Sequence, residues 1–269
     1  MAGSLAAAGA AVLPRDAIVP LTQSRFLIRV LIASWVMPPI VAVGVLQAMP
    51  IDSGYAVGLW LLALAPCAPF APAMARSTGG DAASMAAVMV LSAALTVVVM
   101  PFAVSRLGTG LTADPMAIAL PLVLFVLLPL AAGIAVRGIR PRVADWLIER
   151  LATVTAVSGG VALLLVAVLH GPGVATAAGS HAIAAQLLFL AAITAAAHAI
   201  GAGLPAAQRS VLTLAVSTRN LGAALAPLVS PDADPNAGVM IAIGAPATLA
   251  VSTVATQWLR RALAVRHAG

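Results

Sequence analysis

The residues best suited to bind a solute lie inside a hydrophobic run, Ser210–Pro227, that is long enough to enter a bilayer. The middle of this run carries four polar residues, Ser217, Thr218, Arg219 and Asn220. At ~1.5 Å per helical residue, Arg219 lies roughly 15 Å from Arg209, near the middle of a ~30 Å hydrocarbon core. A charge there costs from ~3 to above 10 kcal/mol, so such residues normally face a cavity or a partner. The pattern predicts a helix that breaks at mid-membrane to form a binding site.

A second irregular stretch, Leu64–Met74, carries prolines at intervals of three, at Pro66, Pro69 and Pro72. Each proline removes a helical hydrogen bond and clashes with the preceding turn. In lipid the released carbonyls need partners, so this stretch should face protein or a water-filled cavity. The sequence therefore predicts a second broken span, with Pro66, Cys67 and Pro69 beside the solute.

The composition predicts an all-α polytopic membrane protein that lies in a lipid bilayer. Of 269 residues, 62% are hydrophobic and 8% are charged, whereas soluble domains carry about 25% charged residues. Uninterrupted apolar runs predict about eight transmembrane helices, two of them discontinuous. The predicted spans are Phe26–Met49, Gly54–Met74, Ala82–Val104, Met116–Val136, Ala144–Leu169, Ala182–Gly203, Ser210–Val229 and Ala237–Leu259. Within the sixth span, Gln186 is predicted to hydrogen-bond to a neighbouring helix.

The arginines predict the orientation, because positively charged loops stay in the cytoplasm. With the N-terminus inside, twelve of the fourteen arginines fall in cytoplasmic segments, Arg106 falls outside and Arg219 lies within a span. Both termini are then cytoplasmic in a multi-pass protein of the bacterial inner membrane. The net charge of +6 is a topology signal, and we expect no nucleic-acid partner.

Catalytic motifs are absent from the sequence, which carries no nucleotide-binding loop, catalytic triad or metal-ligand cluster. Its single cysteine excludes an internal disulfide. We expect a protein that is not an enzyme and that holds neither a cofactor nor a resident metal.

Two blocks of the sequence, Leu62–Pro101 and Gly203–Ala226, resemble the bile acid:sodium symporter superfamily. The first is similar to the family's proline-containing break, half-helix and Gly-Asp/Asn turn, and the second to its GLP…Q-K/R…Q-N…G-x-A pattern. The resemblance implies an inverted-repeat transporter fold in which two discontinuous helices cross. It also implies core helices at about 26–104 and 182–259, panel-like helices at about 116–169, and a segment 1–25 that ends a helix whose beginning is absent.

The positions where the resemblance implies sodium ligands carry other residues here. They are Ala33, Ala71, Pro72, Ala215 and Arg219, and only Asn220 matches the family. Sodium needs several oxygen ligands, and exchanging a carboxylate for alanine while adding a guanidinium removes both attraction and space. We expect the family's sodium sites to be absent.

Three functional hypotheses follow from the sequence. The first is a secondary carrier that moves a small organic anion by alternating access, coupled to protons or to no ion. The second is an arsenite permease, because Cys67 precedes Gly80 by thirteen residues, a spacing that resembles the permeases of this superfamily. The third is a non-transporting receptor or scaffold built on a degenerate carrier fold.

Overall fold

Helices alone make up the regular structure of the described residues in this computed structural model, which describes residues 2–106, 114–151, 173–174, 177, 179–229 and 233–268. The first part of the chain forms α1 (Ala2–Ala10), α2 (Pro14–Ile18), the 3-10 helix η1 (Val19–Thr22), α3 (Ser24–Leu31), the π-helix η2 (Ile32–Val36), α4 (Met37–Ala48), α5 (Ser53–Leu64), α6 (Ala71–Ser77) and α7 (Ala82–Arg106).

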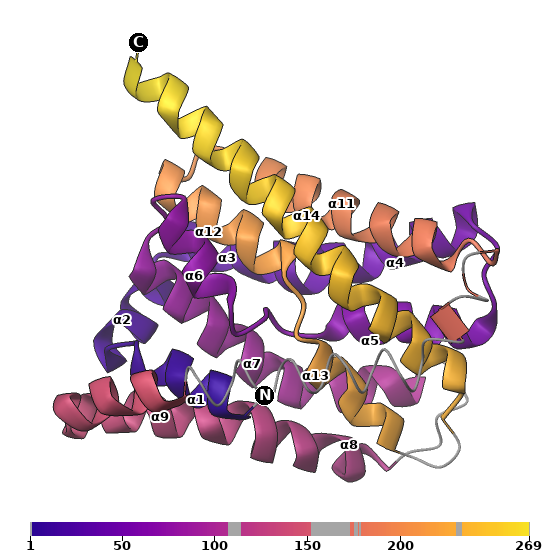
Figure 1. Cartoon of the computed structure of the whole chain (residues 1–269), viewed down its shortest axis with the longest axis horizontal. Helices are drawn as coiled ribbons and strands as arrows, with labels where there is room; N and C mark the ends of the chain where they lie inside the picture. Colours follow the sequence, from indigo (N-terminus) through magenta and orange to yellow (C-terminus); the bar gives the residue numbers. More distant parts are fainter. Residues whose placement is uncertain are drawn as a thin grey trace.

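The second part of the chain forms α8 (Pro115–Leu122), the π-helix η3 (Val123–Leu127) and α9 (Leu128–Ile139), followed by a helix at 141–151. After these come α11 (Ala182–Ile200), α12 (Ala206–Ser217), α13 (Leu221–Leu225), the 3-10 helix η4 (Ala226–Val229) and α14 (Pro235–Ala268). Figure 1 shows α8 and α9 along one edge of the bundle with α1 beside them, and α11 and α14 toward the opposite edge.

Among the described residues, six helical segments are long and apolar enough to cross a membrane: Ser24–Ala48, Ala82–Arg106, Pro115–Ile139, Ala182–Ile200, Ala206–Leu228 and Pro235–Ala262. They coincide with six predicted spans, and the predicted Gly54–Met74 span appears as α5 and α6. Most of the predicted span Ala144–Leu169 lies outside the described residues. The structure thus confirms a polytopic helical protein, while the number of eight spans and the inverted repeat stay predictions.

The first break separates α5 from α6, and its prolines explain it. The residue before a proline avoids the helical region, and Ala65, before Pro66, is extended at φ −71° and ψ 146°. Pro72 lies in the first turn of α6, where its missing N–H is not needed. Residues 65–70 are consequently not helical, which confirms the predicted break.

The second break lies at residues 218–220, inside the span predicted from the buried arginine. Thr218 and Asn220 are both extended, with φ −103° and ψ 126°, and φ −80° and ψ 93°. Asn220 then caps α13, because its Oδ1 accepts a hydrogen bond of 3.2 Å from the Ala223 amide. The helix before this break begins at Ala206, four residues ahead of the predicted start at Ser210.

Two π-helical turns precede prolines inside other spans. The turn η2 is followed by Pro38 and Pro39 in the first turn of α4, and η3 is followed by Pro129 in the first turn of α9. A wide turn rearranges the hydrogen bonds that a proline would otherwise interrupt. Each span therefore continues through its proline without a gap.

The segment before the first long span is packed into the bundle. The helix α1 crosses α9 closely at two glycines: a Cβ on Gly133 would stand 2.2 Å from the Ala6 carbonyl oxygen, and one on Gly9 2.2 Å from that of Leu130. Backbone atoms cannot retreat as side chains can, so only glycine fits this crossing. Leu5 and Ala10 are buried as part of the same contact.

Contacts near the ends of the predicted spans join segments that the predicted topology places on one side. Arg260 Nε donates to the Ser77 carbonyl at 2.8 Å, between two segments predicted inside. Asn236 Nδ2 donates to Asp52 at 3.3 Å, between two loops predicted outside. These pairs agree with the predicted order of crossings, and the identity of the cytoplasmic side stays a prediction.

Candidate functional site

The two breaks meet inside the bundle. The backbone N–H of Asn220 donates to the carbonyl of Pro66 at 2.9 Å, and Nη1 of Arg219 donates to the carbonyl of Ala65 at 3.0 Å. Both acceptors are carbonyls that the proline-rich break withdraws from helical hydrogen bonding. Two carbonyls of the first break are therefore hydrogen-bonded by donors of the second break.

Arg219 is buried, with 2% of its surface exposed, and its guanidinium is only partly satisfied. Its Nε and Nη2 have no hydrogen-bond partner among the described residues. The ion pairs found in the described part of the chain join Arg15 to Asp16 and Arg137 to Asp145, both away from the breaks. A guanidinium is always protonated under ordinary conditions, so this charge calls for an acceptor.

Asn220 adds another unpartnered donor. Its Oδ1 is used in the cap of α13, whereas its Nδ2 has no hydrogen-bond partner among the described residues, and the residue is 3% exposed. The break thus carries three side-chain nitrogens that bear hydrogen and lack an acceptor, Arg219 Nε, Arg219 Nη2 and Asn220 Nδ2.

Ser217 and Thr218 use their hydroxyl hydrogens to close the end of α12. Ser217 Oγ donates to the Leu214 carbonyl at 3.1 Å, and Thr218 Oγ1 lies 2.9 Å from the same carbonyl. These bonds satisfy carbonyls that a helix end leaves free. What the two hydroxyls retain for a solute is acceptor lone pairs.

In the first break, Pro66 and Cys67 are buried and Pro69 is half-buried. The Sγ of Cys67 lies 3.4 Å from Ser92 Oγ on α7. Pro69 lines a pocket of about 380 Å³ together with residues of α1, α6 and α7. This pocket lies between the first break and α1, and Arg219 is not among its lining residues.

The positions at which the chain departs from the implied sodium ligands offer no side-chain oxygen. Ala33, Ala71 and Ala215 are buried at 0%, 0% and 3% exposure, and Pro72 lines the pocket beside Pro69. No group of three or more His, Cys, Asp or Glu able to hold a metal ion occurs among the described residues.

Two buried polar side chains without hydrogen-bond partners were not predicted as site residues, and one of them, Gln186, lies near the start of α13. Gln186 on α11 was expected to bond a neighbouring helix, but both its amide oxygen and nitrogen lack a partner in the described structure, and so does Thr248 Oγ1 on α14. A Cβ on Gly244 would stand 3.3 Å from Gln186 Nε2 and 3.2 Å from Leu221, the first residue of α13. Their sequence signal is weak, since single polar residues occur in many apolar spans.

Two interrupted spans that meet inside a helical bundle are a feature of many secondary transporters. The family model for the Sodium Bile acid symporter family matches residues 6–176, more than half of the chain, and the chain belongs to this family. The match contains the first break, whereas the block Gly203–Ala226 with the second break lies beyond it. No curated protein matches the chain.

Proposed function

We propose that this chain is a secondary carrier for a small organic anion, with Arg219 as the anion-binding residue. Membership of the Sodium Bile acid symporter family supports a role as a membrane transporter. We propose an anionic solute because the unpartnered side-chain atoms of the second break are all hydrogen-bond donors.

The donor set selects the charge of the solute. A cation would find a guanidinium at the crossing, and two unit charges of like sign 4 Å apart repel by ~4 kcal/mol at an effective dielectric of 20. An anion instead supplies the acceptor that Arg219 Nε and Nη2 lack. A carboxylate fits best, because it can accept two parallel hydrogen bonds from one guanidinium, which gives orientation as well as energy.

Alternating access requires the crossing to be reached from each side in turn. In this structure Arg219 and Asn220 are buried, while the pocket beside Pro69 lies next to the first break. We infer that this pocket is the approach from one side, and that a shift of α1 and α9 against the crossing helices opens the path to Arg219. In this proposal the helices at about 116–169, which include α9, form a panel that moves against the core helices at about 26–104 and 182–259.

The test is substitution at Arg219 in the purified chain, reconstituted into liposomes and offered a panel of aliphatic carboxylates. Arg219→Gln should abolish binding and counterflow while the protein still inserts and elutes as the wild type does. Arg219→Lys should keep the charge but lose the bidentate contact, and weaken binding by roughly tenfold or more, the difference expected for one lost charged hydrogen bond. Arg140→Gln, at an exposed arginine outside the crossing, serves as the matched control.

The outcomes separate the remaining hypotheses. If Arg219→Gln transports as the wild type does, Arg219 is not the anion-binding residue. A wild-type chain that neither binds nor moves any carboxylate of the panel would favour the non-transporting receptor or scaffold.

A further inference from the structure

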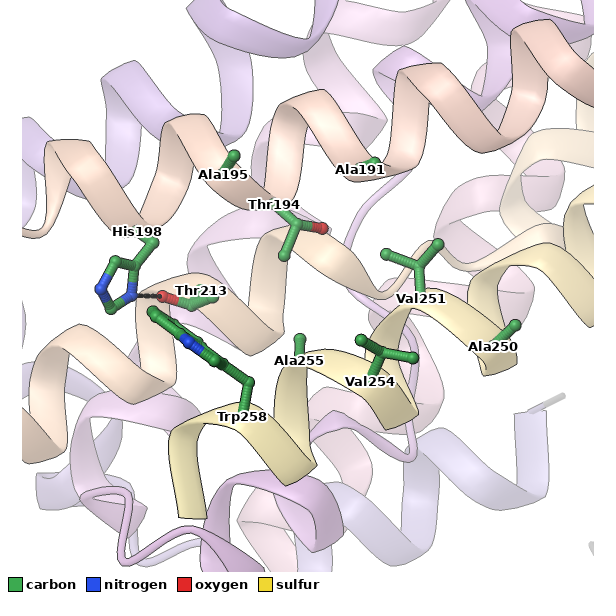
Figure 2. Close-up of a pocket in the computed structure, with 10 residues that line it drawn as sticks. All are labelled: Ala191, Thr194, Ala195, His198, Thr213, Ala250, Val251, Val254, Ala255 and Trp258. Atoms are coloured by element: carbon green, nitrogen blue, oxygen red, sulfur yellow. Dashed lines mark hydrogen bonds between the residues drawn. The ribbon is translucent and has the colours of Figure 1, made fainter. Parts of the chain in front are cut away.

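A groove unrelated to the crossing runs between α11, α12 and α14. Its volume is about 570 Å³, and its walls are mainly apolar, formed by Ala191 and Ala195 of α11 and by Val251, Val254, Ala255 and Trp258 of α14. Figure 2 shows these side chains on the two facing helices, with His198 and Trp258 together at one end of the groove. Ala191, Ala195 and Val254 are exposed, so the groove opens to the surroundings of the bundle.

The end of the groove at His198 is polar and basic. The ring of His198 meets Trp258 edge-on with centroids 4.5 Å apart, and its Nδ1 lies 3.2 Å from Thr213 Oγ1. Beyond these rings a second pocket of about 290 Å³ shares His198 and Trp258 and adds Arg209. Arg209 Nε donates to the His198 carbonyl at 2.9 Å, which fixes the guanidinium at this end of the groove.

A second arginine reaches the same turn between α11 and α12. A Cβ on Gly203 would stand 3.6 Å and 3.8 Å from the two Nη atoms of Arg29. Arg29 Nη1 is buried and has no hydrogen-bond partner among the described residues. Gly203 itself adopts φ +79°, which glycine permits at little cost, and so the turn leaves room for both arginines.

These features define the chemistry of one occupant. The groove lies on helices that are long and apolar enough to cross a membrane, and the arginines lie where two of these helices end and begin. In the part of the chain that the structure describes, neither Arg29 nor Arg209 forms an ion pair. The apolar groove fits an acyl chain. The two arginines at its end fit a phosphate group, because guanidinium groups bind phosphate through paired hydrogen bonds.

We propose that this groove binds one anionic phospholipid, with its phosphate at Arg209 and Arg29 and one acyl chain along α11 and α14. The lipid site is separate from the proposed anion site at Arg219, because it lies on the outer surface of the bundle and uses none of the residues at the breaks. A resident lipid would hold α14 against α11 and α12, and α12 is the first part of the span that contains the second break.

The experiment measures lipid binding to the delipidated protein in detergent, by thermal unfolding and by native mass spectrometry. The probes are phosphatidylglycerol, phosphatidylcholine with the same acyl chains, and glycerol 3-phosphate. We expect phosphatidylglycerol to raise the unfolding temperature and stay bound in the gas phase, while the other two probes do neither. Arg209→Gln and Arg29→Gln should each weaken phosphatidylglycerol binding by roughly fivefold, as expected for one arginine at an anionic lipid surface.

Further variants separate the headgroup from the chain. Arg209→Lys keeps the charge but loses the paired hydrogen bonds of a guanidinium, so it should bind phosphatidylglycerol more weakly than the wild type and more tightly than Arg209→Gln. Ala195→Trp fills the groove from its exposed rim and should abolish binding with both arginines intact. Arg142→Gln and Ala132→Trp, at exposed positions elsewhere, are the matched controls and should bind as the wild type does.

Three results would overturn the proposal. Equal stabilisation by phosphatidylcholine would show that the headgroup is not recognised. Equal stabilisation by glycerol 3-phosphate, with no effect of Ala195→Trp, would leave a simple anion site and no lipid groove. Unchanged phosphatidylglycerol binding in the folded Arg209→Gln and Arg29→Gln variants would remove both arginines from it.

Discussion

Arg219 and Arg137 show how differently this protein treats two arginines. The guanidinium of Arg137 donates to the Ala10 carbonyl and lies 2.8 Å from an Asp145 oxygen, so its charge is paired within the chain. Arg219 is more deeply buried, yet it has one carbonyl partner and two nitrogens without any. A structural role would call for the first arrangement. The second suits a residue whose partner arrives and leaves.

The arsenite hypothesis depends on a single residue, Cys67. It is the only cysteine in the sequence, so the chain cannot offer arsenic(III) several thiolates, and its Sγ lies 3.4 Å from Ser92 Oγ. We predict that Cys67→Ser keeps transport within about fivefold, because a serine hydroxyl can replace the thiol beside Ser92 and a net hydrogen bond is worth only about 1 kcal/mol. Uptake in proteoliposomes and arsenite resistance of expressing cells are the measurements.

Arsenite resistance that depends on the wild-type chain and disappears in Cys67→Ser would contradict this prediction. Cys67→Ala, which removes the contact with Ser92 altogether, distinguishes loss of a thiol from loss of packing.

At the scale of elements, the crossing of α1 and α9 depends on backbone contact at Gly9 and Gly133. We predict that Gly133→Ala lowers the free energy of unfolding by about 1–3 kcal/mol, because the added methyl meets a carbonyl oxygen that cannot move alone. Thermal unfolding in detergent measures the effect.

Gly44→Ala is the matched control, since a Cβ on this helical glycine meets nothing within 4 Å. It should be neutral or stabilising by up to about 1 kcal/mol, the difference in helix propensity. If the two variants unfold at the same temperature, the close crossing does not contribute to stability.

The sequence predicted those elements whose causes are local. Prolines at Pro66 and Pro72 act on their own neighbours, so the first break could be predicted from their spacing. The second break has no proline or glycine at residues 218–220, and it was predicted from the cost of burying Arg219. The start of α12 was placed too late, because hydropathy excludes Gln208 and Arg209 from an apolar run although a helix accommodates them.

The pairing of the breaks could not be predicted from local pattern alone. The hydrogen bond from Asn220 to Pro66 joins residues far apart in the chain, and only the resemblance implied that the two segments cross. The missing partners of Gln186 and Thr248 depend likewise on how α11, α13 and α14 pack. For the candidate residues Ser217 and Thr218, residue type alone could not show that their hydroxyl hydrogens are used by α12.

For the whole molecule, we predict that transport does not depend on sodium. The positions at which the family resemblance implies ligands carry Ala71, Pro72, Ala215 and Arg219, and backbone carbonyls beside a guanidinium form a poor cation site. Uptake of a carboxylate into proteoliposomes should be unchanged when choline replaces sodium. A steep dependence on sodium would show that main-chain oxygens suffice to build the site.

The orientation of the chain in the membrane can be tested by the accessibility of single cysteines. In a Cys67→Ser background, an impermeant thiol reagent added outside whole cells should label single cysteines at the predicted outer loops, at Ser53, Gly110, Gly173 and Asp234. Cysteines at the predicted inner loops should stay unlabelled until the cells are opened, at Gly80, Arg140 and Ala207. The reverse labelling pattern would invert the topology.

The main-chain bond between Asn220 and Pro66 has a consequence for the history of the site. Because it uses a backbone amide and a backbone carbonyl, it survives almost any exchange of side chains around it. Side chains around the crossing could therefore be exchanged in evolution while the two segments remained joined. A scaffold held by its main chain leaves the chemistry of its binding site free to change without a new architecture.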